Sequence, residues 1–104
     1  MAKFVFIYHG GSMPETQEEG AEVMAAWEAW AGGMGEAVVD FGNPVGKSST
    51  VHSGGKVTED GGANPTSGYS LVRADSKEQA VEMAKGCPIL LRGGSVEVAE
   101  AMEM

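Results

Sequence analysis

Cysteine, basic residues and long apolar runs are all scarce in this sequence. The single cysteine, Cys87, cannot form a disulfide within the chain, and with two histidines it makes too small a set for a structural zinc site. No apolar run approaches the ~20 residues of a membrane helix, and the opening MAKFVFIYHG is too short for a signal peptide and lacks a cleavage site. These absences predict a soluble, cytoplasmic protein without a metal or other cofactor.

Positive charge is also scarce, because seven lysine and arginine residues face fifteen acidic residues and leave a formal charge of -8. Such a chain repels the phosphates of nucleic acid and of anionic lipids. We therefore expect neither nucleic acid nor a membrane as a partner. The apolar share of 42% and the charged share of 21% are ordinary for a globular protein, and the length suits one domain over residues 1–104.

Six segments carry the patterns of strands and helices. Strands are predicted where β-branched and aromatic residues gather or alternate with polar ones, at residues 3–9 (KFVFIYH), 36–41 (EAVVDF), 67–74 (SGYSLVRA) and 95–99 (SVEVA). Helices are predicted at residues 16–32 and 76–85, because each begins with the spacing of a capping box, Thr16 with Glu19 and Ser76 with Gln79.

The segment between the second and third predicted strands is rich in glycine and poor in large apolar residues. Within it, Ser53, Gly54 and Gly55 separate two short alternating pieces of residues 50–58 (TVHSGGKVT), which predicts a small β-hairpin. The whole order predicts an α+β fold of the ferredoxin-like βαββαβ type. It has a four-stranded antiparallel sheet, two helices on one face, and a β-hairpin insertion between strands 2 and 3.

A sheet with both helices on one face leaves its other face without cover. In the first strand Val5, Ile7 and His9 share one face, while Phe4, Phe6 and Tyr8 share the other. A monomer rarely tolerates a large exposed apolar face, and two-fold pairing is the commonest way to cover one. The sequence therefore predicts a homodimer that packs sheet against sheet.

The string GYSLVRADSKEQAVEMAKGCPILLRGGSVEVAEAMEM, taken with the opening KFVFIYHGG and the central glycine-rich hairpin, resembles the YCII-related domain family. Within that family it is similar to the branch named for an Asp-Gly-Pro-Phe (DGPF) motif. Residues 68–74, the helix start at Asp75 and Ser76, and residues 94–98 match best. The resemblance implies a ferredoxin-like domain that dimerises into a dimeric α/β barrel with a cleft at the sheets.

Most members of this family have no assigned reaction, although a histidine on the first helix and an aspartate near its end are proposed as a catalytic pair in some. The first helix here, QEEGAEVMAAWEAWAGGMG, has neither residue, and Asp60-Gly61 is followed by Gly62-Ala63 in place of Pro-Phe. The sequence therefore leaves open whether the chain is an enzyme.

His9 and Asp40 are the candidate catalytic residues. Both lie near the ends of predicted strands, and an imidazole held by a carboxylate exchanges protons near neutral pH. In the predicted strand order the third strand separates the two, so contact between them requires long reach or a partner chain. The alternative is that His9 is a strand-end residue that bonds to the backbone.

Four further residues are candidates for ligand binding. Trp27 and Trp30 could line an apolar pocket, although their spacing also fits the core-facing stripe of a helix. Ser70 and Glu97 are expected on the sheet face away from the helices, where a polar group needs a partner or a ligand.

Two functions follow from these residues. The first is a small homodimer that binds a small molecule or a partner in a cleft at the sheet face. The alternative is a dimeric-barrel enzyme that applies acid/base chemistry, with His9 as the base, to a small apolar or phenolic substrate.

Overall fold

The computed structural model describes residues 2–103. Within them two helices and six strands follow one another along the chain. They are β1 (Ala2–His9), α1 (Gln17–Met34), β2 (Val38–Asp40), β3 (Thr50–Val51), β4 (Val57–Thr58), β5 (Thr66–Ala74), α2 (Lys77–Ala84) and β6 (Ser95–Glu100). Two short 3₁₀ helices, Gly35–Ala37 and Pro88–Arg92, complete the order. The α+β class predicted from the sequence is confirmed.

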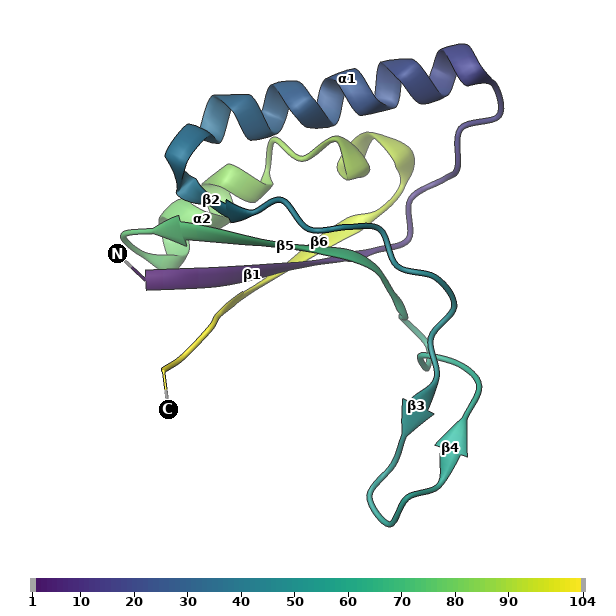
Figure 1. Cartoon of the computed structure of the whole chain (residues 1–104). Helices are drawn as coiled ribbons and strands as arrows, with labels where there is room; N and C mark the ends of the chain where they lie inside the picture. Colours follow the sequence, from purple (N-terminus) through teal and green to yellow (C-terminus); the bar gives the residue numbers. More distant parts are fainter. Residues whose placement is uncertain (1, 104) are drawn as a thin grey trace.

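Four strands form one antiparallel sheet in the order β2-β5-β1-β6. Both helices lie on the same side of this sheet, so the fold has a helical layer and a sheet layer (Figure 1). The long strand β1 lies between β5 and β6, as its apolar sequence predicts for a central strand. The first and last described segments lie at one end of the sheet, and His9 lies at the other.

Local sequence signals account for where the helices begin. The Thr16 hydroxyl accepts a hydrogen bond from the Glu19 amide at 3.0 Å, and the Ser76 hydroxyl accepts one from the Gln79 amide at 3.1 Å. Both N-caps are therefore confirmed. The second strand is shorter than predicted, because Gly35–Ala37 form a 3₁₀ turn.

The core lies between the sheet and the helices. Phe4, Phe6 and Tyr8 of β1 are fully or almost fully buried there, with Val72 of β5 and Ala80 of α2 beside them. Alternation along β1 explains this, since every second side chain points toward the helical layer. The other set, Val5 and Ile7, is only half-buried.

Trp27 and Trp30, two of the predicted ligand-binding residues, belong to the packing beneath α1. The Trp27 ring meets Tyr8 edge-on with centroids 5.0 Å apart, and Trp30 stacks on Phe6 at 6.1 Å. The Trp30 indole N–H also donates to the carbonyl of Met83 at 2.9 Å. The structure thus places both indoles on the helical side of the sheet, away from the face on which the sequence predicts a cleft.

Ser70 requires a correction. It is 2% exposed and points toward the helices, so the expectation that it lies on the opposite face is wrong. Its hydroxyl accepts a hydrogen bond from the Tyr8 hydroxyl at 2.8 Å and donates one to the carbonyl of Phe41. The small polar residue is tolerated in the core because both of these bonds satisfy it.

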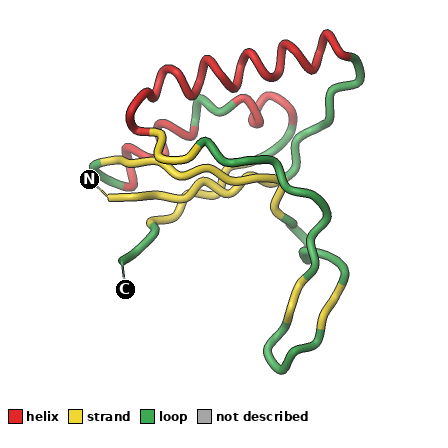
Figure 2. Tube along the Cα trace, viewed as in Figure 1, coloured by secondary structure: helices red, strands yellow, loops and turns green. Residues whose placement is uncertain are grey.

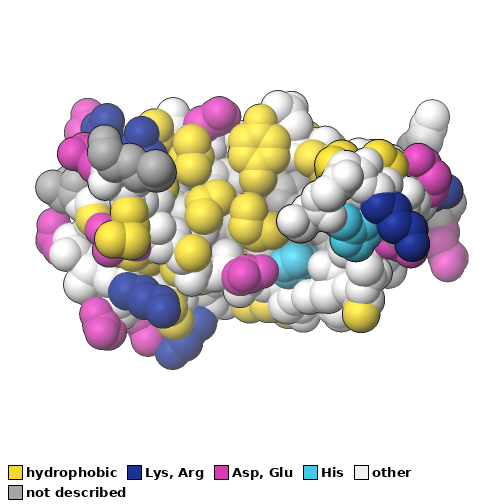
Figure 3. Space-filling view, turned by 90° about the horizontal axis from the view of Figure 1, so that it is seen from below, with side chains coloured by type: hydrophobic (Ala, Val, Ile, Leu, Met, Phe, Trp, Pro, Cys, Tyr) yellow, Lys and Arg dark blue, Asp and Glu magenta, His cyan; other side chains and the backbone are white. Residues whose placement is uncertain are grey.

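The face of the sheet without helices is called the open face below. Cross-strand pairing places Val5 opposite Leu71 and Ala99, and Ile7 opposite Tyr69 and Glu97, so these side chains share this face. Apolar side chains gather over the middle of the sheet when the molecule is viewed from below (Figure 3). No element of the described chain packs over them, which agrees with the uncovered face expected from the sequence.

Residues 45–65 form a projection that we call the arm. It leaves the His9 end of the sheet and extends to the side away from the helices, mostly as loop with two short strands near its tip (Figure 2). Thr50 pairs with Thr58 and Val51 with Val57, which confirms the predicted hairpin. Across residues 2–103, neither helix has the length and apolar character needed to cross a membrane.

Candidate functional site

His9 is the polar residue at the end of β1, where the sheet, the arm and the start of β6 meet. Only 8% of the residue is exposed. The chain around it is tightly packed, since a Cβ atom on Gly94 would lie 2.8 Å from the His9 carbonyl oxygen. Glycine at position 94 therefore lets the two segments approach closely enough for His9 to face β6.

Both ring nitrogens of His9 face hydrogen-bond acceptors. Nδ1 lies 3.2 Å from the carbonyl oxygen of Pro65, and Nε2 lies 2.9 Å from Oε1 of Glu97. A neutral imidazole has a single N–H, whereas the protonated ring has two. Only the imidazolium can donate both bonds, so this arrangement favours the charged form of His9.

The pKa of His9 is accordingly raised above its usual value of 6.5. The hydrogen bond to the Glu97 carboxylate is the largest cause, and the bond to the Pro65 carbonyl adds to it. Burial of the ring acts in the opposite direction and does not cancel these bonds. The raised pKa shifts His9 toward its protonated form, whereas the sequence-based role of a base requires the neutral ring.

Glu97 is the solvent-facing member of this pair. Its side chain is 65% exposed, compared with 10% for that of His9. Strand β6 places it opposite Ile7, on the face expected from the sequence. A molecule that approaches the open face therefore contacts the exposed Glu97 carboxylate before it contacts His9. The more deeply buried His9 ring lies within hydrogen-bond distance of that carboxylate.

Apolar side chains border the pair. Ile7 lies two residues before His9 on β1 and pairs across the sheet with Tyr69 of β5, and both are half-buried. Val5 and Leu71 extend this surface along the same two strands. The open face thus places the exposed Glu97 carboxylate beside apolar side chains, and both kinds of group line small-molecule sites.

The structure does not bring Asp40 and His9 together. Asp40 pairs with Leu71 of β5, whereas His9 pairs with Thr66, so the two lie about 16 Å apart along the strand direction. Strand β5 also separates β2 from β1. The Asp40 carboxylate instead accepts a hydrogen bond from the Gly42 amide at 2.8 Å, which stabilises the turn after β2.

Cys87 and Tyr8 are also potentially reactive, but burial keeps both side chains in their protonated, less reactive forms. Burial raises the pKa of the Cys87 thiol to about 11, so the thiolate that a nucleophile requires is scarce at neutral pH. Burial likewise raises the pKa of Tyr8, whose hydroxyl bonds to Ser70. Within residues 2–103 no three histidine, cysteine or acidic side chains converge as metal ligands would.

Two of the hollows on the surface of residues 2–103 lie elsewhere. One, of about 360 Å³, lies between α2 and β6 and is lined by Val81, Ala84, Lys85, Leu90, Val96 and Val98. The other, of about 200 Å³, lies at the base of the arm and is bordered by Lys47, Ser48, Asp60 and Pro65 among others. Neither has the paired carboxylate and imidazole that the open face presents.

The pairing of His9 with Glu97 was missed by sequence reasoning, although both residues were candidates. They are 88 positions apart, and only the antiparallel pairing of β1 with β6 brings them together. The Pro65 carbonyl was not a candidate, because every residue has a backbone carbonyl and the sequence does not indicate which of them meets a side chain. The alternating SVEVA segment was the available signal for Glu97, since it placed that side chain on the face away from the helices.

Comparisons of the chain with models of protein families, with curated proteins and with solved structures give no match.

Proposed function

We propose that the protein is a homodimer that binds a small molecule between its two open faces, with the Glu97 carboxylate as the polar anchor. The observation that carries this proposal is the His9–Glu97 pair at the border of an apolar surface that the chain leaves uncovered. A carboxylate held by a protonated imidazole is fixed in direction, and fixed acceptors give binding sites their specificity.

The ligand's chemistry follows from the groups that would touch it. An ionised carboxylate only accepts hydrogen bonds, so the ligand needs a donor such as a hydroxyl group. The positive charge of protonated His9 offsets the negative charge of Glu97. A neutral hydrogen-bond donor on the ligand is therefore the best match for the pair. Ile7, Tyr69 and Leu71 favour an apolar or aromatic body. A small phenol has both parts.

The strand order β2-β5-β1-β6 and the two helices on one face support the finer proposal of a ferredoxin-like fold, in which two copies stack sheet to sheet. This is also what the resemblance to the YCII-related family implies, and we propose membership of that family on the same grounds. A cytoplasmic location remains part of the proposal.

Binding can be tested by titrating wild-type protein with a panel of phenols and with matched aromatics that lack the hydroxyl group, followed by NMR. We expect shifts of Ile7, Tyr69 and Leu71 with the phenols. The variant Glu97→Gln should weaken phenol binding by about tenfold or more, because a hydrogen bond to a charged acceptor is lost. Glu28→Gln is the matched control, since Glu28 is exposed on α1 and the charge change is the same.

Two results would contradict the proposal. One is equal affinity of phenols for wild type and Glu97→Gln. The other is a set of shifted residues confined to the helical side, such as Ala80 and Ala84. Dimerisation is tested separately by sedimentation, where a species of twice the 10.8 kDa chain mass is expected at micromolar concentration.

A second candidate function is acid/base catalysis on a small apolar or phenolic substrate by the same pair. The 2.9 Å contact between His9 Nε2 and Glu97 Oε1 favours it, because an imidazole and a carboxylate at this distance share a proton that acid/base catalysis can move. In this form His9 acts first as an acid. Turnover that is equal in wild type and His9→Asn, in a screen that detects wild-type activity, would dismiss this candidate.

A further inference from the structure

The arm has no apolar cover of its own. Val51 is 70% exposed and Val57 is 50% exposed, although the two are paired across β3 and β4. At the base of the arm Val45 is 40% exposed. A two-stranded hairpin is marginally stable in water unless its apolar side chains pack against something else.

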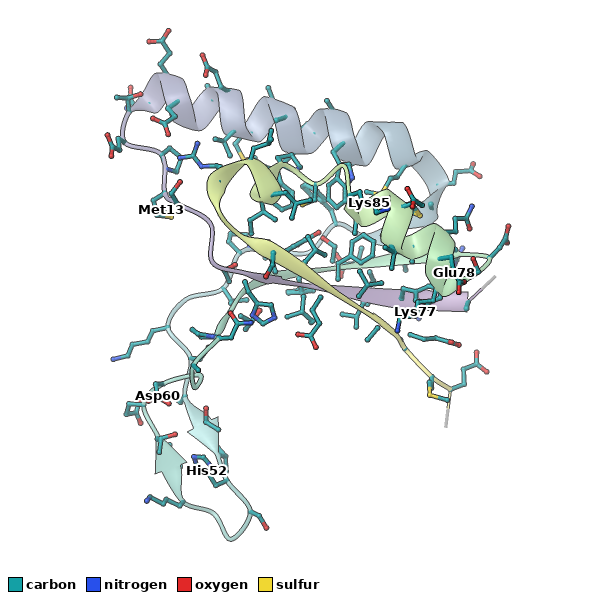
Figure 4. The ribbon with its side chains drawn as sticks, turned by 180° about the vertical axis from the view of Figure 1, so that it is seen from behind. Met13, His52, Asp60, Lys77, Glu78 and Lys85 are labelled. Atoms are coloured by element: carbon teal, nitrogen blue, oxygen red, sulfur yellow. The ribbon has the colours of Figure 1, made fainter. Side chains whose placement is uncertain are left out.

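The hydrogen bonds within the arm are local. His52 bonds through its Nε2 to the Thr58 hydroxyl at 3.0 Å, and the Ser49 hydroxyl donates to Glu59 at 2.9 Å. These contacts tie one leg of the hairpin to the other and leave its valines exposed. His52 lies near the tip of the arm and Asp60 nearer its base, far from Lys77 at the start of α2 and from Lys85 just after its end (Figure 4).

The direction of the arm matches that of the open face. It projects to the side of the sheet that the helices leave uncovered (Figure 1). Sheets that stack face to face lie about 10 Å apart, whereas the nine residues from Val45 to Ser53 span up to about 30 Å. The arm is therefore long enough, when extended, to pass the plane of a second sheet stacked on the open face.

Charge also favours a second copy as the occupant. All fifteen acidic residues of the chain lie outside residues 50–58, where the ionisable side chains are His52 and Lys56. The end of the arm is thus free of acidic side chains in a strongly acidic molecule, although Glu59 and Asp60 follow it directly. A second copy presents the negative surface that complements it.

We infer that the arm of each subunit clasps the other subunit of the dimer and packs Val51 and Val57 against it. This inference rests on the dimer of the proposed function, and it adds a second contact to the stacked open faces. The occupant of the arm's apolar surface is a second copy of this chain.

The experiment compares dimer dissociation constants by sedimentation for wild type and three variants. Val51→Ser combined with Val57→Ser removes the apolar surface of the arm, and Leu71→Lys places a charge on the open face. Leu91→Ser is the matched control, because Leu91 is 89% exposed on the 3₁₀ helix Pro88–Arg92. The arm double variant should dissociate about tenfold more readily or worse, while Leu91→Ser should match wild type.

The arm valines are exposed, so their loss should leave the fold intact, and equal circular dichroism spectra check this. Hydrogen exchange supplies a readout local to the arm: amides of β3 and β4 should exchange more slowly at concentrations where the dimer forms. Slower exchange at these strands in wild type, and its loss in the double variant, supports the clasp.

The outcomes separate the two proposals. If the double variant dimerises as wild type does while Leu71→Lys does not dimerise, the clasp is overturned and the stacked dimer stands. If Leu91→Ser weakens the dimer as much as the arm variant, the clasp is also overturned. If wild type remains monomeric up to millimolar concentration, the dimer of the proposed function fails and the clasp fails with it.

Discussion

Replacing Ser70 by alanine removes the hydroxyl that connects β1, β5 and the end of β2. Ser70 accepts a hydrogen bond from the Tyr8 hydroxyl at 2.8 Å and donates one to the Phe41 carbonyl. Tyr8 is 4% exposed, so its hydroxyl would have no access to water as a replacement partner. Phe41 is 38% exposed, so this residue lies closer to solvent than Tyr8 does.

These exposures set the size of the effect. A buried donor without a partner costs about 1–3 kcal/mol, so we expect Ser70→Ala to lower the free energy of unfolding by about 2 kcal/mol. Tyr8→Phe removes the donor and leaves Ser70 with its bond to Phe41, which should cost about 1 kcal/mol. The double variant has no unpaired hydroxyl, so its cost should fall short of the sum of the single costs by about 1 kcal/mol. A domain of 104 residues is stable by about 5–15 kcal/mol, so each of these changes is measurable.

Urea denaturation followed by circular dichroism at one fixed protein concentration gives the four free energies. Additive costs would refute the reasoning, because they would mean that Tyr8 and Ser70 do not share a buried bond. A cost near zero for Ser70→Ala, together with weaker phenol binding, would refute it as well and would restore Ser70 to the ligand cleft. Ser70→Thr is a useful comparison because it keeps the hydroxyl.

Three further predictions concern a cap, a turn and the His9–Glu97 pair. Thr16→Ala removes the acceptor for the Glu19 amide and should lower the free energy of unfolding by about 1 kcal/mol in urea denaturation. Gly42→Ala should cost about 2 kcal/mol or more in the same assay, because Gly42 has φ 78° and a Cβ there would collide with the Tyr69 backbone. The pKa of His9 is raised in the folded state, so its stabilising effect is fully present below about pH 6.5 and is lost as the pH rises through the higher folded value. Glu97→Gln should lower the pKa of His9, measured by NMR titration, and reduce this loss.

Each of these predictions has a matched control. Thr16→Ser keeps the capping oxygen and should cost little. Gly46 has no atom within 4 Å of a Cβ placed on it, so Gly46→Ala should be tolerated where Gly42→Ala is not. Glu28→Gln changes the charge by the same amount as Glu97→Gln and should leave the His9 titration unchanged. Equal effects of variant and control would contradict the structural reason in each case.

Helix starts and strand segments could be predicted because they depend on residues close in the sequence. The Thr16 and Ser76 hydroxyls each cap an amide three residues away, and alternation along β1 separates Phe6 from Ile7 without reference to the rest of the chain. The hairpin of β3 and β4 was likewise visible in the turn residues between them. These signals are local, so folding elsewhere does not change them.

The face of β5 could not be predicted in the same way. Its two sets of alternating residues both contain apolar side chains, and the set with the larger ones, Tyr69 and Leu71, lies on the open face. The smaller Ser70 and Val72 face the helices, where the rings of Tyr8 and Trp27 fill the space. Polarity alone therefore assigned Ser70 to the wrong face, because its two hydrogen bonds come from distant segments.

By itself the sequence determined the order of the elements, the helix caps, the hairpin and the two faces of β1, since each depends on spacings of a few residues. Tertiary structure alone decided that His9 meets Glu97 and Pro65 rather than Asp40. The physical reason is register: a shift of one residue between two strands exchanges their faces, and that register is set by packing over the whole sheet. The candidate site depends on this register. The sequence indicated His9 and Glu97 separately, but it did not indicate that they meet.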